Sequence, residues 1–327
     1  MILNKRHRRL RSEAWTRNLV RESNVSSFDF ILPIFLTEGN NKKEEISSMP
    51  GVFRYSPDNL SEIIDRALKN SIPAVILFPQ TPESKKNDSA SEALNENNLI
   101  NISIREIKRK YKNKIGIMTD VALDPYTKHG HDGILKNNQI LNDETVKILV
   151  QQSLIQASSG SDVIAPSDMM DGKILEIRKS LEKNNFKNVL ILSYAAKYAS
   201  GFYGPFRDGV GSRQKKKIDK STYQMDFSNS IDALRQINKD IEDGADMIMI
   251  KPALSYLDII SKAKENFNIP IIAYNVSGEY SMLKTGIKNN IFEEDILKEV
   301  IISFKRAGAN AIVSYFANEY IEKYILR

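Results

Sequence analysis

The sequence predicts an α/β chain that folds as one (β/α)₈ barrel, residues 28–327, behind a basic N-terminal arm, residues 1–27. The length of 327 residues suits a barrel of about 250 residues with decorations. Segments with helical patterns separate short apolar runs rich in β-branched residues, as expected for parallel strands covered on both faces. Eight such runs predict strands at 30–36, 74–78, 115–119, 162–165, 189–193, 247–250, 271–274 and 311–314.

The intervening segments carry helix boundary signals. Helices are expected at 144–157, 231–241 and 296–306, and Gly244 and Gly308 are placed to stop the last two. Eight repeating units favour a closed barrel, and a doubly wound open sheet is the alternative fold. No glycine-rich phosphate loop follows the first strand, which weakens the hypothesis of a nucleotide-binding protein.

The composition excludes several classes of protein. With 41% hydrophobic and 27% charged residues, the chain has enough apolar side chains for a large core. No apolar run is long enough to span a bilayer and no secretory signal opens the chain, so we expect a cytoplasmic protein without a membrane partner. The chain contains no cysteine, so any metal must be held by oxygen or imidazole ligands.

The net charge of +6 arises almost entirely at the start of the chain. Residues 1–21 hold one acidic residue, Glu13, against seven basic ones, namely Lys5, Arg6, Arg8, Arg9, Arg11, Arg17 and Arg21. Such an arm could bind nucleic acid or resemble a transit peptide. Because the remainder is neutral on balance, we favour an arm that packs on a neighbouring subunit, and expect no nucleic-acid partner.

Lys251 is the last residue of an otherwise apolar strand and precedes Pro252. Active sites of barrels lie at the carboxyl ends of the strands, where a partly dry pocket would lower the pKa of a lysine. A lysine with a pKa of about 7 to 8 supplies far more neutral amine for Schiff-base formation than one near 10.4. A lysine that reaches solvent from the strand end is the alternative, and position alone leaves both open.

A second lysine, Lys197, follows the strand expected at 189–193. Because like charges repel, two lysines at strand ends of one barrel would lower the pKa of at least one of the two amines further. Two amines would also suit two carbonyl substrates. The stretch 200–222, rich in glycine, arginine and lysine, is a candidate lid on the same face. A solvated loop lysine is again the alternative.

Around Lys197, the segments 193–200 (SYAAKYAS) and 202–208 (FYGPFRD) resemble the signature of the porphobilinogen synthase family. Further blocks that resemble the family run through nearly the whole chain in family order. They are 48–52 (SMPGV), 120–126 (DVALDPY), 129–133 (HGHDG), 165–172 (APSDMMDG), 222–226 (TYQMD), 249–252 (MIKP) and 276–280 (VSGEY).

The resemblance implies that two 5-aminolevulinate molecules condense to porphobilinogen through Schiff bases, in tetrapyrrole and heme biosynthesis. Lys251 would bind the first substrate and Lys197 the second. Arg207 and Lys220 would hold the carboxylate of the second substrate, as charge-assisted donors do. For the first substrate, Ser277 and Tyr315 would hold the carboxylate, while Tyr274 and Phe206 would wall the pocket or belong to the barrel core.

Zinc-dependent relatives carry three cysteines where this chain has Ala122, Asp124 and Asp132. We therefore expect no catalytic zinc and no organic cofactor, and the resemblance is to an aspartate-rich branch that responds to magnesium or monovalent cations. Carboxylates suit such cations, and a cation near Asp124 and Asp132 is one interpretation. The other, slightly favoured, gives these two carboxylates roles with water and protons, and lets Asp120 tune Lys197.

Two departures from the family pattern concern regulation and the signature. Gln236 stands where many relatives have a glutamate for allosteric magnesium, so we expect that metal to be weakened or absent, although Asp240 follows one turn later. Ala195 replaces a common serine.

The resemblance implies a homo-octamer joined by the N-terminal arms. A class I aldolase is the alternative enzyme, which explains Lys251 but not a second lysine followed by an anion-binding lid.

Overall fold

The computed structural model describes residues 4–211 and 219–326. Eight parallel strands form the predicted barrel, and the pairing of the last strand with the first closes it, which excludes the open sheet. The barrel strands are β1 (Phe30–Leu36), β4 (Ala74–Pro79), β5 (Gly116–Val121), β8 (Val163–Pro166), β9 (Leu190–Lys197), β10 (Met247–Lys251), β11 (Ile271–Asn275) and β12 (Ala311–Ser314).

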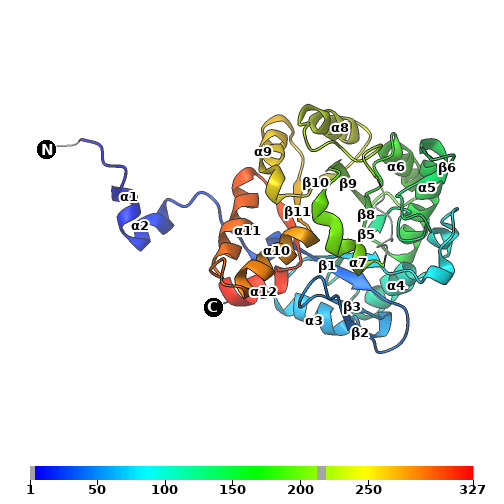
Figure 1. The fold of residues 1–327 in the computed structure, drawn as a ribbon, viewed down its shortest axis with the longest axis horizontal. Coiled ribbons are helices and arrows are strands. Elements are labelled where there is room, and N and C mark those ends of the chain that lie inside the picture. Colours follow the sequence, from blue (N-terminus) through cyan, green and yellow to red (C-terminus); the bar gives the residue numbers. More distant parts are fainter. Residues whose placement is uncertain (1–3, 212–218, 327) are drawn as a thin grey trace.

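A ring of helices covers the outside of the barrel (Figure 1). The outer helices are α3 (Ser61–Lys69), α4 (Leu99–Tyr111), α5 (Asn142–Ser159), α6 (Lys173–Lys183), α8 (Ile231–Glu242), α9 (Leu257–Asn266), α11 (Ile296–Ala307) and α12 (Ala317–Tyr324). α8 and α11 end as expected, because Gly244 and Gly308 take the left-handed backbone conformation with φ of +100° and +117°.

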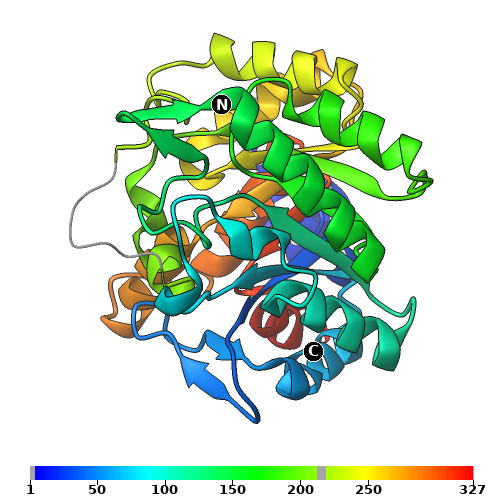
Figure 2. The same cartoon turned by 90° about the vertical axis from the view of Figure 1, so that its right-hand side faces the viewer.

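Several elements decorate the barrel. β2 (Lys43–Glu45) and β3 (Phe53–Tyr55) extend the sheet beside β1, and β6 (Ile134–Lys136) pairs with β7 (Gln139–Leu141). Figure 2, turned by 90°, shows the first pair as blue arrows at the lower edge and the second as green arrows near the top. The helix α10 (Ser277–Lys288) follows β11 directly and adds to the lining of the barrel mouth.

The predicted lid is described over residues 200–211 and 219–222, and 212–218 lie outside the described residues. A 3₁₀ turn, η5 (Gly201–Tyr203), and a short helix, α7 (Gly204–Gly209), follow β9 and lie across the mouth of the barrel (Figure 1). This mouth is formed by the carboxyl ends of the strands, where barrels place their active sites.

The N-terminal arm carries α1 (Arg9–Ser12) and α2 (Ala14–Leu19) and extends away from the barrel (Figure 1). None of the residues in these two helices is buried. Trp15 and Leu19 are 68% and 75% exposed, so large apolar side chains of the arm contact little within this chain.

One strand extends further in the structure than the sequence predicted. The strand predicted at 189–193 runs from Leu190 to Lys197, so Lys197 ends a strand instead of following one. Within this strand the register shifts against β10: Ser193 pairs with Ile248, but Ala196 pairs with Ile250, which leaves one extra residue on β9. Ala195, one of the departures from the family pattern, lies within this bulge and is fully buried.

Candidate active site

Two lysines end neighbouring strands of the barrel. Lys251 is the last residue of β10, Lys197 is the last residue of β9, and the two are partners in the strand register. Their exposed fractions are only 5% and 6%. The interpretation of solvated lysines is therefore wrong for both, and the structure brings two amines together at the carboxyl end of the barrel.

Four aromatic rings surround the amine of Lys251. Its Nζ lies 4.6 Å from the ring centroid of Tyr274, 4.9 Å from Phe206, 5.1 Å from Tyr194 and 5.3 Å from Tyr203. Burial among these rings, which we call the aromatic cage, and secondarily the positive charge of Lys197 together lower the pKa of Lys251 to about 7. About half of this amine is therefore neutral at pH 7, as a nucleophile requires.

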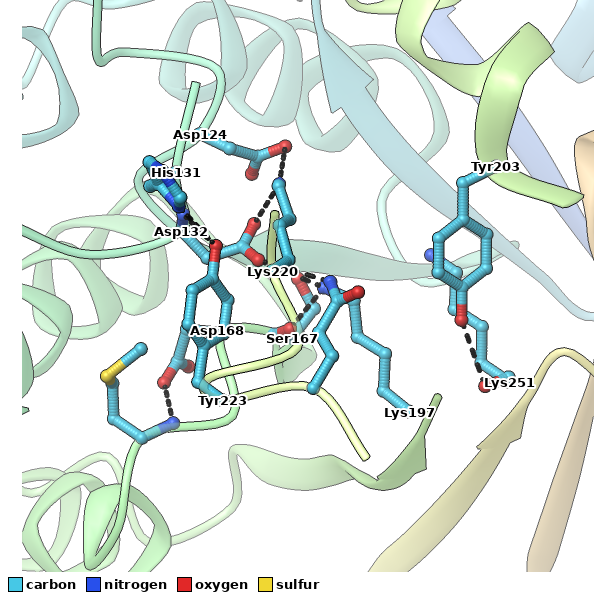
Figure 3. Close-up of polar contacts among 12 residues, drawn as sticks. Asp124, His131, Asp132, Ser167, Asp168, Lys197, Tyr203, Lys220, Tyr223 and Lys251 are labelled. Carbon is cyan, nitrogen blue, oxygen red and sulfur yellow. Dashed lines mark hydrogen bonds and ion pairs between the residues drawn. The ribbon is translucent and has the colours of Figure 1, made fainter. Parts of the chain in front are cut away.

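Lys197 has polar and acidic neighbours instead. Its Nζ donates a hydrogen bond of 2.5 Å to the carbonyl oxygen of Ser167 and lies 3.8 Å from Oδ2 of Asp132. Burial opposes its charge, but Asp132, Asp124 and Asp120 outweigh that effect and raise its pKa above the ordinary value. Figure 3 shows this amine turned toward Ser167 and the aspartates, while Lys251 lies apart beside Tyr203.

The aspartates form a buried cluster with opposite pKa shifts. Burial opposes ionisation of Asp132, but Lys197 and Lys220 hold the pKa of its carboxyl well below its usual range. Burial, followed by the negative charge of Asp132, raises the pKa of Asp124 to about 7. Burial also raises the pKa of Asp120. Such divergent values are typical of sites that move protons near neutral pH.

The residues expected to hold the carboxylate of the first substrate lie around the aromatic cage. Tyr315 shares a hydrogen bond of 3.1 Å with the hydroxyl of Tyr274, a member of the cage. The hydroxyl of Ser277, at the start of α10, accepts a hydrogen bond of 2.9 Å from the backbone N–H of Phe206. Phe206 itself is partly buried against the core, so it is both a wall of the site and part of its packing.

The residues expected to hold the second carboxylate line one cleft beside the lid. Arg207, from α7, and Lys220 border this cleft together with Ser200 and Gln224. Nζ of Lys220 lies 3.1 Å from Oδ1 of Asp132 and 3.8 Å from Oδ2 of Asp124 (Figure 3). The structure thus places Lys220 between the cleft and the acidic cluster.

The acidic cluster holds an ammonium where a cation was one interpretation. Within residues 4–211 and 219–326, no group of three or more acidic or histidine side chains is arranged to hold a metal ion. The ammonium of Lys220 lies where a cation between Asp124 and Asp132 would be held. Magnesium is commonly bound by one or two carboxylates with waters completing its octahedron, so an ion at this position would have to displace the ammonium of Lys220.

Gln236 and Asp240, at the position where we expect the allosteric magnesium to be weakened or absent, contact each other. Nε2 of Gln236 donates a hydrogen bond of 2.8 Å to Oδ1 of Asp240. The other oxygen, Oδ2, accepts a hydrogen bond of 2.5 Å from Ser193, and the Asp240 side chain is buried. Both oxygens of this carboxylate are thus engaged within the protein, so they do not face a hydrated ion.

Sequence reasoning missed several residues that the fold brings to the amines. Tyr194 and Tyr203 belong to the aromatic cage, and the carbonyl of Ser167 holds Lys197. The hydroxyl of Tyr223 accepts a hydrogen bond of 3.3 Å from the backbone N–H of Asp132 and lies 3.1 Å from Nδ1 of His131. All of them lie in the segments that resemble the family, and that is the signal that could have found them.

Comparison with known proteins assigns the family. A family model described as delta-aminolevulinic acid dehydratase matches residues 4–323. The chain belongs to this family. The delta-aminolevulinic acid dehydratase of Bradyrhizobium diazoefficiens is 49% identical over 319 residues, which cover 97% of this chain and 90% of that protein. The relative of the same name from Bacillus subtilis is 44% identical and covers 96% of each chain.

A solved structure agrees with this assignment. The chain matches the delta-aminolevulinic acid dehydratase (porphobilinogen synthase) of Toxoplasma gondii, in complex with the reaction product porphobilinogen, with a TM-score of 0.95 and 40% identity. The match covers 98% of this chain and 91% of that one. The resemblance that the sequence motifs indicated is therefore confirmed. In addition, no helix among the described residues is long and apolar enough to cross a membrane.

Proposed function

We propose that this protein is a porphobilinogen synthase, a lyase that condenses two 5-aminolevulinate molecules to porphobilinogen with loss of water. The observation that supports this most strongly is the pair of buried lysines at neighbouring strand ends, whose pKa values shift in opposite directions. A single Schiff-base lysine would serve an aldolase. Two amines with separate surroundings suit a reaction that joins two ketones.

Lys251 is proposed to form the Schiff base with the first substrate. Its neutral amine attacks the ketone carbon and passes one proton to the oxygen. The resulting carbinolamine hydroxyl takes a second proton from solvent and leaves as water, which gives a cationic iminium. The faces of Tyr274 and Phe206, 4.6 Å and 4.9 Å from Nζ, stabilise that charge. Ser277 and Tyr315 would donate hydrogen bonds to the carboxylate of this substrate.

Lys197 is proposed to bind the second substrate. Its amine is protonated at rest, so it must release a proton before it attacks. Asp124, whose pKa is about 7, can accept or return a proton at neutral pH, whereas Asp132 remains a carboxylate. Arg207 and Lys220, at the cleft beside the lid, would bind the carboxylate of this second substrate.

Assembly and metal use extend the same proposal. We propose a homo-octamer joined through the N-terminal arms, because the exposed apolar side chains of Leu10, Trp15 and Leu19 need a surface to cover them. We also propose that the enzyme works without zinc, since the positions of the zinc cysteines hold Ala122, Asp124 and Asp132. No bond-forming step in this proposal uses magnesium or a monovalent cation.

Two measurements test this function. Purified protein incubated with 5-aminolevulinate should give a pyrrole that reacts with Ehrlich's reagent, and borohydride should fix substrate mass onto Lys251. The Lys251→Met variant should lose both signals, while Lys183→Met, a change at an exposed lysine of α6, should keep them. Full activity in Lys251→Met would overturn the mechanism, and an adduct without Ehrlich-positive product would favour an aldolase-like enzyme.

A further inference from the structure

Tyr194 reaches the two amines because of the bulge in β9. In a regular strand, residues three apart face opposite sides of the sheet. The extra residue between Ser193 and Ala196 changes that alternation, so both Tyr194 and Lys197 point into the barrel. Ser193 faces the opposite side, where its hydroxyl meets Asp240 of α8.

The ring of Tyr194 lies beside both reactive groups. Its centroid is 5.1 Å from Nζ of Lys251 and 6.0 Å from Nζ of Lys197. Phe206 and Tyr274 are in contact range of the Lys251 amine only. Tyr194 is therefore a shared wall between the positions that the two substrates would occupy.

The hydroxyl of Tyr194 has no hydrogen-bond partner among the described residues, although the side chain is fully buried. The other tyrosines of the cage do have partners. Tyr203 donates to the carbonyl oxygen of Lys251, and Tyr274 shares a hydrogen bond with Tyr315. A buried hydroxyl without a partner costs about 1–3 kcal/mol, so its retention at a reactive site calls for a ligand atom.

The hydroxyl of Tyr194 keeps its proton at working pH and so is available as a hydrogen-bond donor. Burial, and then the nearby Asp120 carboxylate, raise the pKa of Tyr194 well above 10, so the group stays protonated. The position beside Lys251 is where a ketone oxygen must lie when the amine attacks the carbon bonded to it. That oxygen gains negative charge in the transition state, and a fixed donor stabilises it.

We propose that the O–H of Tyr194 donates a hydrogen bond to the ketone oxygen of the keto acid at Lys251. The same oxygen takes one proton from the attacking amine to become the carbinolamine hydroxyl and a second from solvent to leave as water, so the tyrosine keeps its own proton throughout. This assignment rests on the function proposed above, because it requires a ketone at Lys251. It makes Tyr194 a catalytic residue of the first Schiff-base step.

The Tyr194→Phe variant tests the proposal, because it removes one atom and retains the ring that faces both amines. We expect the rate of borohydride-fixed adduct formation at Lys251, with levulinate as probe, to fall roughly 100-fold or more. The turnover number with 5-aminolevulinate should fall by a similar factor, with a smaller change in KM. The unfolding midpoint should stay the same or rise, since an unpaired buried hydroxyl is lost.

Tyr111→Phe is the matched control. Its hydroxyl donates a hydrogen bond of 2.7 Å to Asp65 on the outside of the barrel. This variant should lower the unfolding midpoint and leave adduct formation unchanged, which is the reverse of the pattern expected for Tyr194→Phe. A ring that acts only through packing and cation–π contact predicts normal rates in Tyr194→Phe, and that result would overturn the proposal.

A spectroscopic measurement gives independent support. In Lys251→Met the probe binds as a ketone, and a hydrogen bond lowers the stretching frequency of its ¹³C-labelled carbonyl. Adding Tyr194→Phe should return that frequency toward the value of an unbonded ketone, and an unchanged frequency would contradict the assignment. If wild-type protein forms no adduct with either keto acid, the proposed function itself fails, which is distinguishable from normal adduct formation in Tyr194→Phe.

Discussion

The ionisation of Lys251 gives the sharpest quantitative prediction. With a pKa of about 7, the neutral amine should grow about tenfold per pH unit below pH 7 and then level off. The rate at which levulinate and cyanoborohydride add mass to Lys251, measured by mass spectrometry at limiting probe concentration, should follow that curve between about pH 5.5 and pH 9.5.

The size of the effect follows from the environment of the amine. A lysine at the ordinary pKa of 10.5 is neutral in about one molecule in 3,000 at pH 7, whereas one at about 7 is neutral in about half. Burial in the aromatic cage, together with the charge of Lys197, therefore supplies roughly three orders of magnitude in reactive amine. A rate that keeps rising to pH 9.5 would refute this argument, because it would show that Lys251 keeps its ordinary pKa.

Changing Lys197 tests the second cause of the shift. Its positive charge is the largest contribution to the lowered pKa of Lys251 after burial. Lys197→Met removes that charge, so the inflection for adduct formation at Lys251 should move up by about one pH unit or more. Lys197→Arg keeps the charge and should leave the inflection in place. Equal inflections in both variants would mean that burial alone sets the pKa.

Three further predictions concern stability and metal. Lys251→Met should be more stable than wild type at neutral pH. Because the pKa of Lys251 is lower in the native than in the unfolded state, the stability of wild type should rise between about pH 7 and 10.5. The stability advantage of Lys251→Met should therefore shrink over this range, as denaturation measured across pH would show. Lys173→Met should lower the free energy of unfolding by about 3–5 kcal/mol, because it leaves the buried Asp168 without the ammonium 3.6 Å away, whereas Lys173→Arg should lose less. Magnesium added to chelated enzyme at saturating substrate should not raise activity severalfold, because the carboxylate of Asp240 already accepts a hydrogen bond from Gln236. A severalfold rise would show an activating site elsewhere.

The sequence predicted the barrel because its strands are unusually easy to recognise. β1 and β4 are buried at every position, so their residues form continuous apolar runs that only a sheet covered on both faces accommodates. The same reasoning placed Lys251 correctly, since an apolar run that ends in a lysine indicates a strand end. Closure itself depends on the pairing of β1 with β12, which lie about 280 residues apart in the chain and carry no local signal of contact.

The interior of the site was harder to predict, because strand alternation fails where the chemistry lies. Strict alternation would place Tyr194 and Lys197 on opposite faces, and only the register shift in β9 brings them to one side. The aromatic cage combines rings from β9, the lid and β11, and no spacing within one segment reveals such a set. Lys220 was expected from the resemblance to bind a carboxylate, but its ion pairs with Asp132 and Asp124 depend on tertiary packing.

The asymmetry between the two amines bears on a difficulty of the proposed reaction. Its two substrates are the same molecule, so their chemistry cannot decide which one plays which part, and the difference must come from the protein. The aromatic cage leaves Lys251 partly neutral, while the aspartates keep Lys197 charged. A neutral amine attacks a ketone and an ammonium does not, so the resting site should accept its first covalent substrate at Lys251. Conversion of Lys251 to a cationic iminium then places a permanent charge near Lys197, which lowers the pKa of that amine and favours release of its proton only after the first substrate is in place.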